Sequence, residues 1–182
     1  HLEKIKDDVP WADYSAPLKV KELWEELDDR GLEPGGSPDV VIAVIDTGVD
    51  YNHPDLKQNM WINGGEIAGN GIDDDANGFV DDIHGVNVVS DTRFHSGDPA
   101  DDHGHGTHVA GVAAAAGNNK IGVVGVAYTS KIMAIKAAQY SGNLTSSDIS
   151  EALYYAVQNG ADVINMSFAQ RVRSPIVEDA LS

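Results

Sequence analysis

The pattern that decides the fold begins at residues 39–46, which read DVVIAVID. Six apolar, mostly β-branched residues between two aspartates are typical of a strand that is buried on both faces. Residues 131–136 (KIMAIK) and 163–166 (VINM) have the same character and predict two further buried strands. Such strands occur in parallel sheets that helices cover on both sides. The three segments therefore predict an α/β fold.

Helical patterns alternate with these strands, and they lie at residues 20–27, 105–116, 145–160 and 174–182. In the first, apolar residues recur at i, i+3, i+4 and i+7, the spacing of one helical face. In the third, Thr145 and Asp148 open a capping box and Gly160 provides a C-terminal stop. The alternation predicts a parallel sheet with helices on both faces, and chemistry at the carboxyl ends of its strands.

The charge of the chain excludes some partners. Its 182 residues carry 12 Lys and Arg against 29 Asp and Glu, a net charge of −17. We expect neither nucleic acid nor a membrane as a partner, because both nucleic acid and anionic membranes bind basic surfaces. The excess of carboxylates suits a cation, with Ca²⁺ the first candidate. The absence of cysteine excludes a thiolate metal site and a cysteine nucleophile.

Asp46 ends the first predicted strand and is followed by Thr47 and Gly48. An aspartic protease uses two Asp-Thr-Gly loops that share a proton, whereas a triad protease uses a buried aspartate to orient a histidine. The chain has one such loop, so the first chemistry would need a dimer, and the helical patterns are unlike the all-β chains that form one. An aspartate that only hydrogen-bonds its own turn is a third interpretation.

Three histidines lie close together in residues 101–111, which read DDHGHGTHVAG. The His-x-His-x-x-His spacing resembles the metallo-β-lactamase loop. That family, however, has aspartate where Thr107 stands, and no histidine follows His108 to complete a zinc site. The string from His105 onward, HGTHVAG, instead resembles the histidine motif of the subtilisin-like serine proteases, the subtilases. Residues 46–56, 118–127 and 163–167 resemble the family's other motifs and occur in the family's order.

The resemblance implies a subtilisin-like fold and a serine endopeptidase with an Asp-His-Ser triad. His105 would be the general base and acid, and Asp46 would orient it and stabilise the imidazolium. Gly106 and Gly111 would let the histidine helix approach the sheet closely. An extended polypeptide substrate would pair as an added strand with two segments. The substrate-binding residues implied in this way are Ser141, Gly142, Asn143, Met166, Ser167 and Phe168.

The family's nucleophile stands in a Gly-Thr-Ser-Met-Ala motif that this sequence lacks. We therefore expect residues 1–38 to form an arm and a short helix, and residues 39–182 to form the N-terminal portion of a catalytic domain. Its sheet would be incomplete because the C-terminal part is absent. That remainder, either in the same chain or as a second chain, would supply the serine and the oxyanion asparagine, and without it the chain would be inactive. The resemblance also implies secretion, which is common in this family.

Residues 73–81, DDDANGFVD, match the calcium-loop pattern D-x-D-x-N-G-x-x-D within an insertion at 70–84. The predicted ligands are Asp73, Asp75, Asn77, the carbonyl of Phe79 and Asp81. Position 12 is His84 and not glutamate, and no helical pattern flanks the loop, so an EF-hand fold is not expected. A solvated acidic turn is the alternative interpretation.

A second calcium site is implied by the subtilase resemblance alone. It would use the side chains of Asp55 and Asn119 and the carbonyls of Ile121 and Val123. One or more structural Ca²⁺ ions that bind only the native state would stabilise it. Two other functions stay open at this point: an inert calcium-binding fragment, and an Asp-Thr-Gly aspartic protease dimer.

Overall fold

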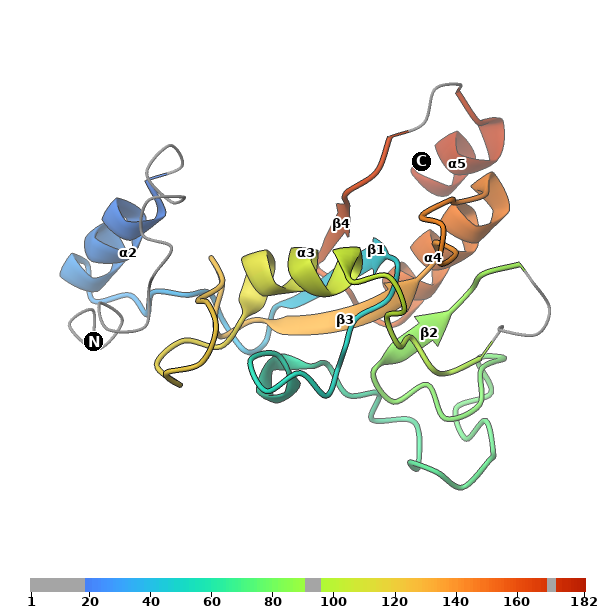
Figure 1. The fold of residues 1–182 in the computed structure, drawn as a ribbon, viewed down its shortest axis with the longest axis horizontal. Helices are drawn as coiled ribbons and strands as arrows, with labels where there is room; N and C mark the ends of the chain where they lie inside the picture. Colours follow the sequence, from blue (N-terminus) through green and yellow to red (C-terminus); the bar gives the residue numbers. More distant parts are fainter. Residues whose placement is uncertain (1–18, 91–95, 170–172) are drawn as a thin grey trace.

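The computed structural model describes residues 19–90, 96–169 and 173–182, so most of the expected N-terminal arm lies outside the described residues. Within those residues a four-stranded sheet has the order β2-β3-β1-β4. The strands, all parallel, are β1 (Val41–Asp46), β2 (Gly85–Asn87), β3 (Lys131–Lys136) and β4 (Val163–Met166). The predicted parallel α/β fold is thereby confirmed (Figure 1).

The helices lie where the sequence patterns predicted them. They are α2 (Val20–Asp29), α3 (His105–Ala114), α4 (Ser146–Gln158) and α5 (Pro175–Ala180), with a 3₁₀ turn η1 (Lys57–Asn59). The capping residue of α4 is Thr145, whose hydroxyl accepts the N–H of Asp148 at 3.2 Å. Gly160, just past the helix, has a φ of +76°, which suits a glycine stop. No helix of the described part is long and apolar enough to cross a bilayer.

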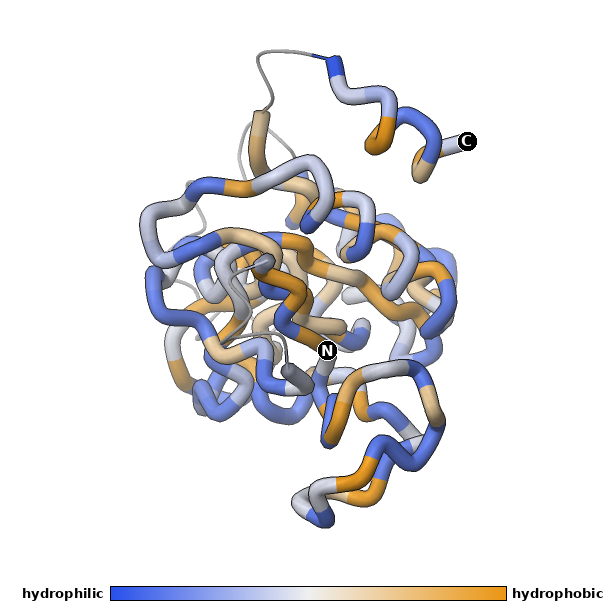
Figure 2. The backbone as a smooth tube through the Cα atoms, turned by 90° about the vertical axis from the view of Figure 1, so that its right-hand side faces the viewer, coloured by the Kyte–Doolittle hydropathy of each residue, from blue (hydrophilic) through white to orange (hydrophobic). Residues whose placement is uncertain are grey.

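Successive residues of the central strands pack against different helices. Ala43 and Ile45 of β1 belong to a core with α4, whereas Val44 belongs to a core with α3. Because side chains alternate along a strand, α3 and α4 cover opposite faces of the sheet. Figure 2 shows hydrophobic segments through the main body, and others in the loop that projects from it and in the helix next to the C-terminus. A sheet covered in this way places its strand ends, and not its faces, at the surface.

The prediction that residues 163–166 form a buried strand is half wrong. These residues form β4, but Val163 is 50% exposed and Met166 36% exposed. The reason is position: β4 pairs with β1 on one side and ends the sheet on the other among the described residues. Its apolar sequence suits a central strand, whereas its place in the described sheet is an edge.

Candidate active site

Asp46 and His105 meet where a strand ends and a helix begins. Asp46 is the last residue of β1 and His105 the first of α3, and His105 Nδ1 lies 2.7 Å from Asp46 Oδ1. The side chain of Asp46 is 4% exposed and that of His105 is 47% exposed. A buried carboxylate thus holds one ring nitrogen while the half-exposed ring stays accessible. This is the arrangement in which an aspartate fixes the tautomer and orientation of a general base.

The backbone holds Asp46 at this point of the sheet. The N–H of Thr47 donates to Asp46 Oδ1 at 2.7 Å. The N–H groups of Ala137 and Ala138, just beyond β3, donate to the Asp46 carbonyl at 2.9 and 3.0 Å. The next residue of the chain thus holds the Asp46 carboxylate, and the segment after β3 holds its backbone.

The first turn of α3 lies directly against the loop that follows β1. A Cβ built on Gly106 would lie 2.1 Å from the Gly48 carbonyl oxygen, which a folded chain does not allow. The predicted need for glycine is confirmed at Gly106. It is wrong at Gly111, where a Cβ would meet nothing within 4 Å. Only the start of the helix approaches the strand end, because Gly111 lies on a later turn.

Asp101, which sequence analysis did not single out, connects the loop after β1 to the start of α3. Its Oδ1 accepts the Thr47 hydroxyl and the N–H groups of His103 and Gly104, each at 2.9 Å. Its Oδ2 accepts the Thr107 N–H at 3.0 Å and hydroxyl at 2.5 Å. Burial by itself raises the pKa of Asp101, but these donors outweigh burial and hold the pKa below its usual value. The sequence signal that could have identified Asp101 is its position shortly before a predicted helix, where aspartate often accepts the N–H groups of the first turn.

A pocket of about 200 Å³ lies beside the Asp46–His105 pair. It is lined by Asp46, Thr47, His103, His105, Ala138, Gly142, Leu144, Ser167 and Phe168. Three of the six predicted substrate-binding residues are among these: Gly142, Ser167 and Phe168. The other three, Ser141, Asn143 and Met166, are not, and the Asn143 amide donates to the Ser141 hydroxyl at 2.9 Å.

Ala138 and Leu144 line the pocket although the sequence motifs did not point to them. They form an antiparallel bridge, and between them the Gly142 N–H donates to the Gln139 carbonyl at 2.7 Å. This turn carries Gly142 into the pocket wall. This pairing depends on how the chain folds back after β3, so no local sequence pattern predicts it.

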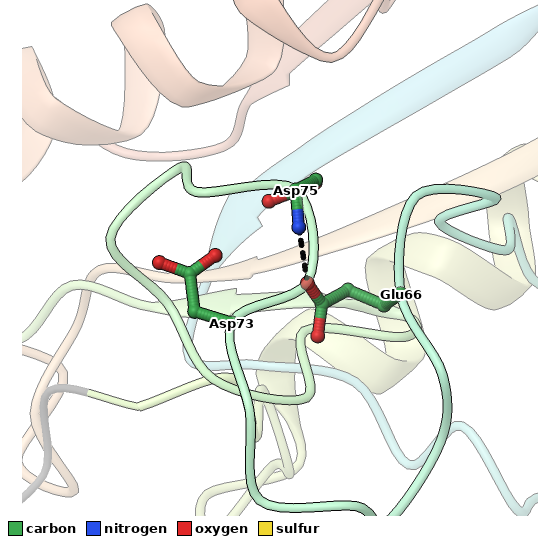
Figure 3. A group of neighbouring side chains, drawn as sticks. All are labelled: Glu66, Asp73 and Asp75. Carbon is green, nitrogen blue, oxygen red and sulfur yellow. Dashed lines mark hydrogen bonds between the residues drawn. The ribbon is translucent and has the colours of Figure 1, made fainter.

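Part of the predicted calcium loop forms a compact acidic group (Figure 3). Glu66, Asp73 and Asp75 each offer a carboxylate oxygen, and these oxygens lie within 4.8 Å of one another. The sequence motif predicted Asp73 and Asp75 but not Glu66, which precedes the loop. Glu66 Oε1 accepts the N–H groups of Asp74 and Asp75 at 2.8 and 3.2 Å. An all-oxygen donor set of this charge fits Ca²⁺.

The remaining predicted ligands of the loop make other contacts. The Asp81 carboxylate accepts the N–H groups of Gly69, Asn70 and Gly71 at 2.7 to 3.2 Å. Asn77 Oδ1 accepts the Phe79 N–H at 2.8 Å. In the described structure, two residues of the pattern D-x-D-x-N-G-x-x-D, Asp73 and Asp75, thus belong to the acidic group. Asn77 and Asp81 instead accept backbone N–H groups that shape the loop.

A buried network connects the loop to the main body. The Asn77 amide donates to Asp75 at 3.1 Å and to the buried Asp82 at 2.9 Å. Asp82 also accepts the hydroxyl of Tyr155 on α4 at 2.5 Å and the amide of Asn63 at 3.1 Å. Burial raises the pKa of Asp82, although these hydrogen bonds oppose the change. Side-chain hydrogen bonds through Asn77 and Asp82 therefore connect the acidic group to Tyr155 on α4.

The four residues of the second predicted calcium site also come together. Asp55, 2% exposed, accepts the Asn119 amide at 2.7 Å and the Val123 N–H at 2.9 Å. Asn119 Oδ1 accepts the Ile121 N–H at 3.0 Å. Both carboxylate oxygens of Asp55 are thus hydrogen-bonded to the loop at 119–123. These contacts use the N–H groups of Ile121 and Val123, whereas the sequence predicted their carbonyls as ligands.

Comparison with known proteins gives consistent matches. The model of the Subtilase family matches residues 37–180. Subtilisin-like protease 1 of Plasmodium berghei (strain Anka) is 49% identical over 129 residues, which are 70% of this chain and 21% of that protein. The halolysin-like extracellular serine protease Nep of Natrialba magadii is 37% identical over 167 residues, or 90% of this chain and 26% of that protein.

A solved structure shares the fold. Sphericase superimposes with a TM-score of 0.64 and 27% sequence identity, over 96% of this chain and 48% of that chain. The chain therefore spans about half of that structure, and about a fifth to a quarter of the two proteins above.

Proposed function

This chain belongs to the subtilase family, and from that premise we propose that it contributes Asp46 and His105 to the triad of a serine endopeptidase. The observation that carries the proposal is the 2.7 Å contact between His105 Nδ1 and the buried Asp46 carboxylate. Family membership establishes the class of protein. The roles of these two residues are our inference from the contact and from the motifs.

In the proposed mechanism, His105 takes the proton of an attacking serine hydroxyl and returns it to the leaving amine. Asp46 keeps the ring in the tautomer that presents its other nitrogen as the base, and it stabilises the imidazolium that forms. The substrate would be an extended polypeptide that lies in the pocket beside Gly142, Ser167 and Phe168. Pairing with backbone would position the scissile bond without a requirement for one sequence.

We propose that the serine and the oxyanion asparagine come from the remainder of the catalytic domain. Two observations support this: the 182 residues contain no Gly-Thr-Ser-Met-Ala motif, and the chain covers 48% of Sphericase. Without a nucleophile the acyl transfer has no attacking group, so the chain by itself would be inactive. The partner of this chain would then be that remainder, in addition to the polypeptide substrate.

We also propose that Ca²⁺ stabilises the fold and that the protease acts outside the cell. Glu66, Asp73 and Asp75 would hold one ion, and the loop around Asp55 a second. A cation would supply the charge compensation that the loop lacks, since the three carboxylates are like charges and repel at this separation. For the location, the support is that Nep is described as extracellular.

The proposed triad is tested by labelling the complete enzyme with a fluorophosphonate and measuring intact mass. We expect a single adduct on a serine, and we expect His105→Ala to abolish labelling and to lower kcat by several orders of magnitude. The control is His108→Ala, on the same helix but outside the lining of the pocket. Inhibition by pepstatin with full activity of His105→Ala would instead favour the aspartic protease interpretation.

The calcium proposal is tested by thermal unfolding with and without a chelator. We expect chelation to lower Tm, because an ion that binds only the native state stabilises it by mass action. Glu66→Gln or Asp75→Asn should shrink this Tm difference, whereas Glu22→Gln, on the exposed face of α2, should leave it unchanged. A melting temperature that chelation does not change would remove both ions from the proposal.

A further inference from the structure

A buried lysine lies beside the proposed catalytic pair and has no role in the mechanism above. Lys136 is the last residue of β3, and its side chain is 8% exposed. Its Nζ donates to the Thr47 carbonyl at 2.7 Å and to Asp102 Oδ1 at 2.6 Å. A buried ammonium is costly unless it is paired, so this cation is held at this place by its two partners.

Both partners of Lys136 flank the catalytic residues in sequence. Thr47 directly follows Asp46, and Asp102 lies in the loop that leads into His105 at the start of α3. In the sheet, Lys136 is itself the register partner of Asp46. One ammonium group therefore fixes the end of β1 and the approach to α3 with respect to each other.

We propose that Lys136 is a positioning residue for the triad: it sets the separation of Asp46 and His105 and supplies a positive charge that opposes protonation of His105. The inference rests on the proposed protease function. It assigns to Lys136 no contact with substrate. Its positioning effect passes through the Thr47 carbonyl and the Asp102 carboxylate, and its charge acts through space.

The charges around His105 predict the direction in which each substitution should shift the protonation of its ring. Among the described residues, the titratable groups on the segments next to the ring include Asp46 at the end of β1 and Lys136 on β3. They also include Asp101, Asp102 and His103 in the loop before α3. Three are carboxylates, and Lys136 is the lysine of this set. Loss of its charge leaves the carboxylates uncompensated and favours the imidazolium. Loss of the Asp102 charge has the opposite effect.

The experiment measures the pH profile of kcat/KM for the complete enzyme at low ionic strength. Lys136→Met should lower kcat by about 10²-fold, the effect of displacing a catalytic group by about 1 Å. It should also move the acidic limb of the profile upward by about one pH unit. Lys136→Arg, which keeps the charge, should keep the limb in place. The matched control is Lys131→Met at the other end of β3, where the more exposed amine donates to the Gln58 carbonyl at 2.9 Å.

A second variant tests the proposal even if loss of the buried Lys136 prevents folding. Asp102→Asn changes a half-exposed side chain, retains Lys136, and should move the acidic limb to lower pH. Limbs that stay in place in both Lys136→Met and Asp102→Asn would overturn the proposal and leave Lys136 a structural residue. The proposal would also be overturned if Lys136→Met changed kcat and the acidic limb no more than Lys131→Met does. Failure of the protease function itself would appear separately, as full activity of His105→Ala.

Discussion

Asp101 and Asp46 show how two carboxylates of one site can be given different tasks by their surroundings. Asp46 is buried and shares a hydrogen bond with a histidine ring, whereas Asp101 accepts backbone and hydroxyl donors from the start of α3. The first can orient a base, and the second holds the helix that carries it. Donors that favour the charged form keep the pKa of Asp101 low.

The lowered pKa of Asp101 predicts a pH dependence of stability. The folded state binds fewer protons at this site than the unfolded state, so the contribution is fully present above the unfolded pKa, about 3.9. It is lost as the pH falls through the lower, folded pKa. Asp101→Asn should therefore reduce the free energy of unfolding by about 1–3 kcal/mol at pH 7, with a smaller reduction at pH 3.

Urea unfolding at the two pH values measures this difference. The control is Asp29→Asn at the exposed C-terminal end of α2, which should behave like the parent at both. An Asp101→Asn defect of the same size at pH 3 and pH 7 would show that the amide disrupts packing and that the charge has no part in it.

At the scale of elements, the junction of β1 and α3 decides whether the site exists. The Gly106 N–H donates to the Thr47 hydroxyl at 2.9 Å, and the Gly48 carbonyl occupies the space where a side chain would start. The strand end and the helix start are thus in direct backbone contact. The position of the imidazole depends on this contact as much as on its own hydrogen bond.

Two glycines of the same helix give a matched prediction. Gly106→Ala should cost about 1–3 kcal/mol of stability by overpacking and lower activity, because Cβ would force α3 away from Gly48. Gly111→Ala, where the added methyl meets nothing within 4 Å, should stabilise the protein by about 0.5–1 kcal/mol through helix propensity. Thermal melts and peptidase rates of both variants test the pair. Equal effects of the two substitutions would contradict the close approach.

At the scale of the whole molecule, the net charge of −17 acts on stability as well as on binding. Like charges spread over a folded chain repel one another, and this favours expansion. Salt weakens the repulsion, because the Debye length falls from about 30 Å at 0.01 M to about 8 Å at 0.15 M. Between these concentrations of NaCl we expect Tm to rise by about 3 °C, or about 1 kcal/mol.

Calorimetry with Ca²⁺ held constant measures the salt effect without the contribution of ion binding. Surface ion pairs would give the reverse sign, since salt weakens them too, but the described pairs such as Arg30–Glu26 are few beside the carboxylates. A Tm that falls with NaCl would mean that attraction, and not repulsion, dominates the charge balance of this protein.

The sequence by itself determined the elements and the two proposed catalytic residues. Strands and helices follow from the period of apolar residues, caps and glycine stops, all of which are local properties. The motifs around Asp46 and His105 predicted that the two would meet, although 59 positions separate them, and they do. Family membership could be read in the same way, since its motifs are short strings that keep their order.

Only the tertiary structure decided which side chains stand beside those motifs. It brought Glu66 to Asp73 and Asp75 and hydrogen-bonded Asp101 to the segments that carry Asp46 and His105. It also buried Lys136 between these segments and placed β4 at the edge of the described sheet. The physical reason is that a contact through space depends on how distant segments pack. A carboxylate or an ammonium has the same local sequence signature whether it ends in solvent or against a catalytic residue.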